Sequence, residues 1–323
     1  MDSFESIIKE SKHAMVIGVG GGGDIVGTIS TSRYLRWLGL KTLIGGLTWE
    51  RYVNDPEPGP RKMGEIVEIE LISATVGLAN EKTRTTNGVR FTESAVAGLL
   101  KENTLLVDLN NGVQGVIDGL NEAIEKLGVD LFMGIDVGGD VLAGGSEPGI
   151  HSMMADSMML SAMANLKVPA VLGVLGCCMD GELTFEEFNN QLAKVASHGG
   201  LLGGWGLTRE DVRVIEEILP HTKTEASALA VKSARGIRGE VEIRGGYCRV
   251  NVTPISAMTF FIDPKVVYDC ISKVAKDLIT TGSLDEAQSV LERFKLPSEL
   301  TFERNFAWKK YADNDKLMDK GRK

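Results

Sequence analysis

The stretch MVIGVGGGGDIVGT, Met15–Thr28, decides the fold that we expect for this chain. An apolar run ends there in four consecutive glycines and an aspartate, and a helix-like pattern follows. Glycine carries a conformational cost in ordered segments, so a run of glycines indicates backbone that turns sharply or approaches another group closely. Gly18, Gly20 and Gly23 satisfy the spacing GxGxxG between a strand and a helix, which is typical of dinucleotide-binding folds. The stretch therefore predicts a ligand site at a strand end.

The start of the following helix favours an anion, because its free backbone N–H groups and its dipole attract negative charge. The glycines expected to contact a nucleotide or another phosphorylated ligand are Gly18, Gly20, Gly21, Gly22 and Gly23. Asp24 would repel a bare pyrophosphate. Its expected partner is a magnesium-bridged phosphate, a ribose-like hydroxyl or an amine, unless the carboxylate only caps the helix.

Short apolar runs alternate with helix-like stretches over the first two thirds of the chain. Strands are predicted at residues 14–19, 41–47, 104–109, 131–137 and 170–175, and helices at 25–38, 113–127, 153–166 and 184–197. Continuous hydrophobicity in these strands indicates burial on both faces, as in a parallel sheet. The alternation predicts an α/β fold with a doubly wound, mostly parallel, Rossmann-like sheet. Segments near 65–72 and 89–95 are expected to add strands or an insertion.

The chain has 323 residues, more than a single core usually accommodates, so we expect one large domain or two medium domains. The pattern changes after HGGLLGGWG, His198–Gly206. Helices follow, and then short strands are predicted at 240–244, 247–252 and 258–262. The predicted division is a nucleotide-binding-type domain over residues 1–206 and a smaller C-terminal α+β region over residues 207–323, packed on it.

Composition restricts the partners. The net charge is −9 and is spread along the chain, which argues against nucleic-acid binding. No apolar run approaches the ~20 residues of a membrane helix, and the N-terminus lacks the order of a signal peptide. The four cysteines form no CxxC motif, which favours a reducing compartment. We therefore expect a cytoplasmic protein that contacts neither membrane nor nucleic acid, and we leave homo-oligomer formation open.

Polar side chains follow the second and third predicted strands. Glu50, after the second strand, is the candidate for binding a ribose hydroxyl, as in dinucleotide folds. Arg51 beside it could meet a carboxylate or phosphate. Asp108 and Asn110 lie at the end of the third strand and are further candidates for cofactor binding, although Asn110 or Asn111 could equally cap the next helix.

The fourth loop, IDVGGDVLAGGSEPG (Ile135–Gly149), carries the chemistry that we expect. Asp136 and Asp140 flank a glycine pair that leaves both carboxylates free to converge on one point. Mg²⁺ typically takes one or two carboxylates together with substrate phosphates. Asp136 and Asp140 are therefore the predicted catalytic and metal-binding residues. Glu147 is a further predicted metal ligand, and His151 is a candidate acid–base group.

These residues also carry a family resemblance over most of the chain. The segments that carry it, in order, are GVGGGGDIVGT, TWERYVNDPEPGPR, DVGGDVLAGGSEPG with HSMMADSMML, TEASALAVKSARG and RGGYCRVNVTPISAMTFFIDP. Together they resemble the domain-of-unknown-function 1152 family of mostly archaeal cytoplasmic proteins, a resemblance that implies no particular reaction. VIGVGGGGD alone is similar to the first nucleotide loop of tubulin-like cell-division GTPases. Their second glycine-rich signature is absent, since DVGGDVLAGG departs from it.

Three functions remain open from the sequence. The first is an enzyme that uses Mg²⁺ on a nucleotide or phosphorylated small molecule, by phosphoryl or glycosyl transfer or by hydrolysis. The second is an NAD(P)-dependent oxidoreductase, which needs no metal and places Glu50 on a ribose. The third is a non-catalytic ligand-binding or assembly protein. Acidic residues at four strand ends favour the first function.

Overall fold

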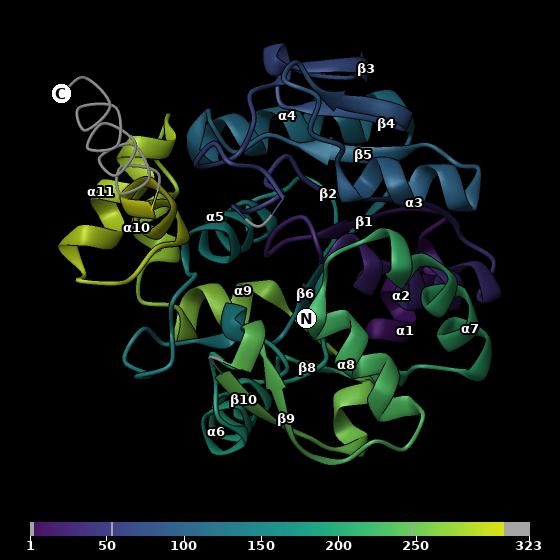
Figure 1. Ribbon diagram of the computed structural model, residues 1–323, viewed down its shortest axis with the longest axis vertical. Helices are drawn as coiled ribbons and strands as arrows, with labels where there is room; N and C mark the ends of the chain where they lie inside the picture. Colours follow the sequence, from purple (N-terminus) through teal and green to yellow (C-terminus); the bar gives the residue numbers. More distant parts are fainter. Residues whose placement is uncertain (1–2, 53, 247, 307–323) are drawn as a thin grey trace, which may run out of the picture.

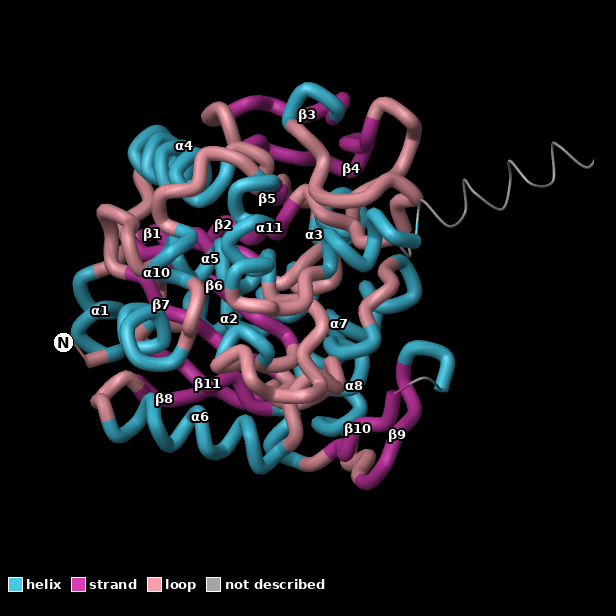
Figure 2. Tube along the Cα trace, turned by 90° about the vertical axis from the view of Figure 1, so that its left-hand side faces the viewer, coloured by secondary structure: helices cyan, strands magenta, loops and turns pink. Residues whose placement is uncertain are grey.

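The fold is built around one large sheet, as the computed structural model of residues 3–52, 54–246 and 248–306 shows (Figures 1 and 2). Nine strands follow one another in the order β3-β4-β5-β2-β1-β6-β7-β11-β8. Helices lie on both faces of this sheet. The chain is therefore an α/β protein with a mixed sheet.

The five central strands are parallel, in the order β5-β2-β1-β6-β7. They are β1 (His13–Gly18), β2 (Lys41–Leu47), β5 (Thr104–Val107), β6 (Leu131–Val137) and β7 (Ala170–Leu175). In β1, Ala14 and Val16 pack into the core on one face, and Met15 and Ile17 pack into the core on the other. This burial on both faces confirms the interpretation of continuous apolar runs as parallel strands.

Two helical layers cover the sheet. The first layer consists of α1 (Phe4–Glu10), α2 (Ile25–Trp37), α3 (Thr92–Leu100), α7 (Arg209–Ile218) and α8 (Glu225–Ala234). The second consists of α4 (Gly112–Leu127), α5 (Met154–Met163), α6 (Phe185–Ser197), α9 (Pro264–Val266), α10 (Ala275–Leu278) and α11 (Leu284–Arg293). The four helices predicted from periodicity are α2, α4, α5 and α6, each confirmed within three residues at its ends.

Antiparallel strands extend the sheet at both edges. The hairpin of β3 (Ile66–Leu71) and β4 (Val76–Thr85) joins β5, which confirms the added strand near 65–72. The segment 89–95 was the other expected addition, and it leads into α3 instead. At the opposite edge, β11 (Met258–Ile262) lies between β7 and β8 (Leu201–Gly206).

Beyond residue 206 the chain returns to the large sheet through β11 and also forms a separate hairpin. That hairpin pairs β9 (Gly239–Ile243) with β10 (Cys248–Val252) in an antiparallel sheet of two strands (Figure 1). The predicted domain boundary at residue 206 falls at the end of β8, and the division of the chain into two domains stays a prediction. None of the helices in the described ranges is long and apolar enough to cross a membrane.

Short helical turns complete the connections. The 3-10 turns are η1 (Met63–Glu65), η2 (Asp140–Leu142), η3 (Leu219–His221), η4 (Arg244–Gly246) and η5 (Pro254–Ala257), and η6 (Val267–Ile271) is a π-helix. Of these, η2 follows β6 directly and η3 precedes α8. η2 therefore lies in a loop that leaves the carboxyl end of a parallel strand, and η3 lies in the connection between α7 and α8.

Candidate metal centre

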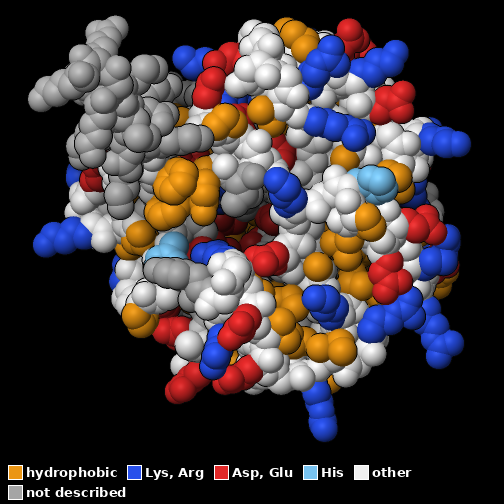
Figure 3. Space-filling view, viewed as in Figure 1, with side chains coloured by type: hydrophobic (Ala, Val, Ile, Leu, Met, Phe, Trp, Pro, Cys, Tyr) orange, Lys and Arg blue, Asp and Glu red, His pale blue; other side chains and the backbone are white. Residues whose placement is uncertain are grey.

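The carboxyl ends of β1 and β6 define the position of the site. These strands are parallel neighbours, with Gly18 opposite Ile135. The chain continues from β1 to β2 on one side, and from β6 to β7 on the other. Loops that leave the two strands therefore diverge and leave a crevice between them, the usual ligand position in open α/β sheets. Figure 3 shows a hollow near the middle of one face of the molecule, with acidic side chains deep inside it.

Carboxylates from four elements meet at this edge. Asp136 is the next-to-last residue of β6, Asp140 opens η2, Asp156 lies in the first turn of α5, and Asp180 and Glu182 follow β7. They form two groups, Asp136–Asp140–Asp156 and Asp140–Asp180–Glu182. In each group, one oxygen from every carboxylate lies within 4.8 Å of the others. Asp140 belongs to both groups, so each group has the geometry of a metal site and the two are adjacent.

The first group is deeply buried, and three of its oxygens lack a hydrogen-bond partner among the described residues. Asp136 and Asp156 are 1% and 2% exposed. Within the part of the chain that the structure describes, Asp136 Oδ2 and both carboxylate oxygens of Asp156 have no hydrogen-bond partner. Buried polar groups in proteins are almost always hydrogen-bonded, and buried charges are paired or bind metals. These oxygens are therefore free to accept a cation.

The electrostatics of the cluster also favour the binding of a cation. For each carboxyl of the first group, burial is the main cause that raises the pKa, and neighbouring carboxylates raise it further. The pKa values of Asp136, Asp140 and Asp156 lie well above the usual range. Burial also raises the pKa of Asp24 to about 7 and the pKa of Asp180 to about 6. Ionisation of this cluster therefore requires a compensating cation.

Arg51 supplies one positive charge beside the cluster. It adopts a left-handed backbone conformation (φ 60°), and its guanidinium lies 4.7 Å from the ring centre of Trp49. Arg51 Nη2 donates to the carbonyl of Gly20 (2.5 Å), and Nη1 lies 3.2 Å from Glu299 Oε1. Burial alone would lower the pKa of Arg51, but Glu299 and other carboxylates raise it. One fixed guanidinium cannot balance five ionised carboxylates, so full ionisation of the cluster needs a further cation.

Glu299 belongs to a segment far along the chain, and it fixes the start of α5. Its carboxylate accepts the backbone N–H groups of Met154 and Ala155, each at 2.9 Å. One turn later, Glu303 Oε2 accepts from the Trp49 indole at 2.9 Å and from the backbone N–H of Gly59 at 2.8 Å. These bonds hold the loop after β2 and the helix that carries Asp156 against each other.

The glycine loop contacts the cluster by its backbone. A Cβ at Gly20 would lie 2.7 Å from Asp24 Oδ2 and 3.2 Å from Asp156 Oδ1, so only glycine leaves room for these carboxylates. Asp24 occupies the N-cap position of α2, but its side chain accepts from the N–H of Gly20 (2.8 Å) and makes no cap bond. The N–H of Gly22 donates to the carbonyl of Trp49 (2.8 Å). The amides of Gly20 and Gly22, two of those expected to contact a phosphorylated ligand, are thus engaged within the protein.

The family assignment follows from comparison with known proteins. The sequence model of a family described as protein of unknown function (DUF1152) matches residues 15–307. The chain belongs to this family. No curated protein matches the chain. The matched range includes the glycine loop and both carboxylate groups, so the candidate centre lies within the part that the DUF1152 family shares. The family resemblance seen in the sequence is confirmed, whereas the similarity to tubulin-like GTPases stays a prediction.

In this DUF1152 member, the structure brings the predicted residues Gly20, Asp24, Arg51, Asp136 and Asp140 together. Glu147 lies apart from them. Its carboxylate accepts from the N–H groups of Gly144 (2.9 Å) and Ser146 (2.8 Å) and from Gln191 (2.9 Å). Burial opposes ionisation of Glu147, but these bonds lower its pKa. Among the described residues, neither candidate metal group includes Glu147, so its predicted role as a ligand has no geometric support.

Other predicted residues have structural partners. Asp108 accepts from the N–H groups of Met63 (3.0 Å) and Asn110 (2.8 Å), and the Asn110 amide donates to the Pro60 carbonyl (3.0 Å). His151 is exposed, and its backbone N–H donates to Glu182 Oε2 (2.7 Å). The predicted cofactor role of Asp108 and Asn110 and the acid–base role of His151 stay predictions.

Three carboxylates of the site were not among the predicted site residues. Asp180 and Glu182 follow β7 in the sequence CCMDGE, and the rule that polar side chains at strand ends converge would have found them. Asp156 lies in a methionine-rich helix whose ten residues are all buried. An aspartate at such a fully buried position is the signal that would have singled it out.

Proposed function

We propose that this chain is an enzyme that binds Mg²⁺ at the buried carboxylates and acts on a nucleotide or another phosphorylated small molecule. The observation that carries the proposal is the set of unpartnered oxygens of Asp136 and Asp156, both buried at the crevice between β1 and β6. Carboxylate oxygens are the ligands that Mg²⁺ prefers, and its remaining positions are usually taken by water and substrate phosphate.

The fold supports the same proposal. In chain order, the five parallel strands are arranged 3-2-1-4-5, which is the order in dinucleotide-binding folds. We therefore infer a doubly wound, Rossmann-like core. Its phosphate position lies at the start of α2, beside the glycine loop and Asp24. A cation between Asp24 and the phosphate would remove the repulsion between them.

The chain's own groups have separate tasks in such an enzyme. Asp136, Asp140 and Asp156 would hold the metal, which supplies Lewis-acid polarisation of a phosphoryl oxygen. Arg51, fixed by Glu299 and Trp49, would contribute positive charge near the transferred group. The buried setting excludes water and strengthens both interactions. The NAD(P) alternative is less well supported, because it needs no metal and gives the buried carboxylate groups no role.

The first test is metal and substrate binding by the wild-type protein. We expect saturable Mg²⁺ binding by isothermal titration calorimetry at pH 8 after treatment with EDTA, followed by Mg²⁺-dependent turnover of at least one compound in a panel of phosphorylated metabolites. Absence of Mg²⁺ binding would overturn the proposal. Mg²⁺ and ligand binding without turnover would favour the non-catalytic alternative, and metal-independent binding of NAD(P) would favour the oxidoreductase.

Stabilisation by Mg²⁺ is expected to depend on pH. Asp24 and Asp180 have folded-state pKa values of about 7 and about 6, above the value of about 4 in an unfolded chain. Without metal, their contribution to stability is present below pH 4 and is lost as the pH rises towards 7. Mg²⁺ competes with these protons. The rise in Tm with Mg²⁺ should therefore be larger at pH 8 than at pH 5.5 in a thermal-shift assay, and equal rises would contradict this prediction.

A further inference from the structure

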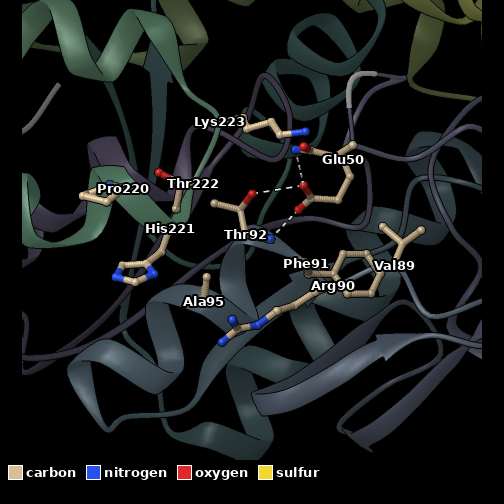
Figure 4. Close-up of a pocket in the computed structure, with 11 residues that line it drawn as sticks. Glu50, Val89, Arg90, Phe91, Thr92, Ala95, Pro220, His221, Thr222 and Lys223 are labelled. Carbon is tan, nitrogen blue, oxygen red and sulfur yellow. Dashed lines mark hydrogen bonds between the residues drawn. The ribbon is translucent and has the colours of Figure 1, made fainter.

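A pocket of about 320 Å³ lies beside the glycine loop, on the side away from Asp156 (Figure 4). Its lining comes from three parts of the chain. Glu50 follows β2, residues 89–92 lead into α3, and residues 220–223 precede α8. The volume is at the lower end of the range for small-molecule sites, so the pocket suits a ligand of the size of a monosaccharide derivative.

The floor of the pocket is an oriented carboxylate. Glu50 is 3% exposed. Its Oε1 accepts from the backbone N–H of Thr92 (2.5 Å), and its Oε2 accepts from the Thr92 hydroxyl (3.0 Å) and the Asn54 amide (2.9 Å). A carboxylate has about four lone-pair sites, and these bonds use three. Oε1 therefore retains capacity to accept one hydrogen bond from a ligand hydroxyl.

The rim of the pocket is basic. Arg90, His221 and Lys223 line it and are exposed, and Figure 4 shows the Lys223 side chain directed towards Glu50. In a chain with a net charge of −9, three basic side chains around one pocket favour an anionic ligand. The wall between rim and floor includes Phe91 and Ala95, which suit the carbon skeleton of a ring.

The pocket and the metal centre lie on opposite sides of the glycine loop. A Cβ at Gly22 would be 2.9 Å from Glu50 Oε1, and a Cβ at Gly20 would be 3.2 Å from Asp156 Oδ1. Two residues of chain span at most ~7 Å. Glu50 and Asp156 therefore lie against the same short stretch of backbone, with the glycine loop between them.

We propose that this pocket binds a sugar phosphate. A sugar hydroxyl would donate a hydrogen bond to the Glu50 carboxylate, and the phosphate would lie at the basic rim. The ligand would present its other end to the metal centre, so the substrate class is a phosphorylated sugar with a second reactive group, such as a further phosphate. The assignment of this ligand as substrate rests on the proposed function, whereas its binding in the pocket does not require the metal.

The test uses ribose 5-phosphate as the probe, in EDTA, by isothermal titration calorimetry. Hydrogen bonds to charged groups contribute about 1.5–3 kcal/mol, so we expect Glu50→Gln and Arg90→Gln each to weaken binding by about tenfold or more. Arg249→Gln is the matched control, because Arg249 is exposed on β10, outside the pocket. Arg90 is also exposed, so its variant should fold even where Glu50→Gln does not.

The outcomes separate this inference from the proposed function. Unchanged affinity in Arg90→Gln, or no binding of ribose 5-phosphate by the wild-type protein at about 10 mM, would overturn the pocket assignment whatever the metal does. Binding that is lost in Arg90→Gln but retained in Arg249→Gln supports it, even if Mg²⁺ does not bind. Weaker binding of 2-deoxyribose 5-phosphate than of ribose 5-phosphate would support the contact between a hydroxyl and Glu50.

Discussion

Asp156→Asn is expected to lower the affinity for Mg²⁺ by at least ~100-fold and to leave the fold intact. Changes in groups that only orient metal ligands already cost 10- to 100-fold in affinity, so loss of a direct ligand charge should cost at least as much. Neither carboxylate oxygen of Asp156 has a hydrogen-bond partner among the described residues, so an amide of the same shape breaks no internal bond. The measurement is a calorimetric Mg²⁺ titration of both proteins.

The stability of the variant distinguishes a metal ligand from a structural residue. Burial and the neighbouring Asp136 carboxylate raise the pKa of Asp156, so its charge opposes folding in the absence of metal. The metal-free variant should therefore have a Tm equal to or above that of the wild type at pH 8. Asp118→Asn, on the exposed surface of α4, is the control with the same chemical change. Wild-type Mg²⁺ affinity in Asp156→Asn would exclude this residue as a ligand.

The sequence predicted the buried centre of the fold better than its edges. β2, β6 and β7 have the bounds predicted from their apolar runs, because burial on both faces demands continuous hydrophobicity. β8 was not predicted, since LLGGWG has three glycines and glycine is depleted in strands. β8 pairs with β11, which lies more than fifty residues further along the chain. This pairing stabilises a strand that the local sequence disfavours.

The site could be predicted only as far as strand ends could be located. Asp136 lies near the end of a predicted strand, and Asp24 and Asp140 lie in the loops that follow predicted strands. The topology of a parallel sheet brings such positions together. Glu299 could not be found in this way. It reaches the site because the C-terminal part of the described chain packs against α5 and the loop after β2. Contacts of that kind depend on tertiary packing and leave no local pattern.

Gly18→Ala is expected to lower the free energy of unfolding by ~3 kcal/mol, because the added methyl group meets backbone that cannot rotate away. A Cβ at Gly18 would lie 2.6 Å from the carbonyl carbon of Asp24 and 2.6 Å from the nitrogen of Ile25. The end of β1 and the first turn of α2 must separate to admit it, and β1 lies at the centre of the sheet. Urea denaturation followed by circular dichroism measures the loss.

Gly64→Ala is the control for this change. Gly64 lies in η1, a Cβ there would meet nothing within 4 Å, and its φ is not in the left-handed region. Its substitution should change the free energy of unfolding by no more than about 0.5 kcal/mol. If the two substitutions had equal effects, the close approach of the α2 backbone to Gly18 would not be the reason that this position requires glycine. A selective loss in Gly18→Ala would assign this glycine to helix–strand packing.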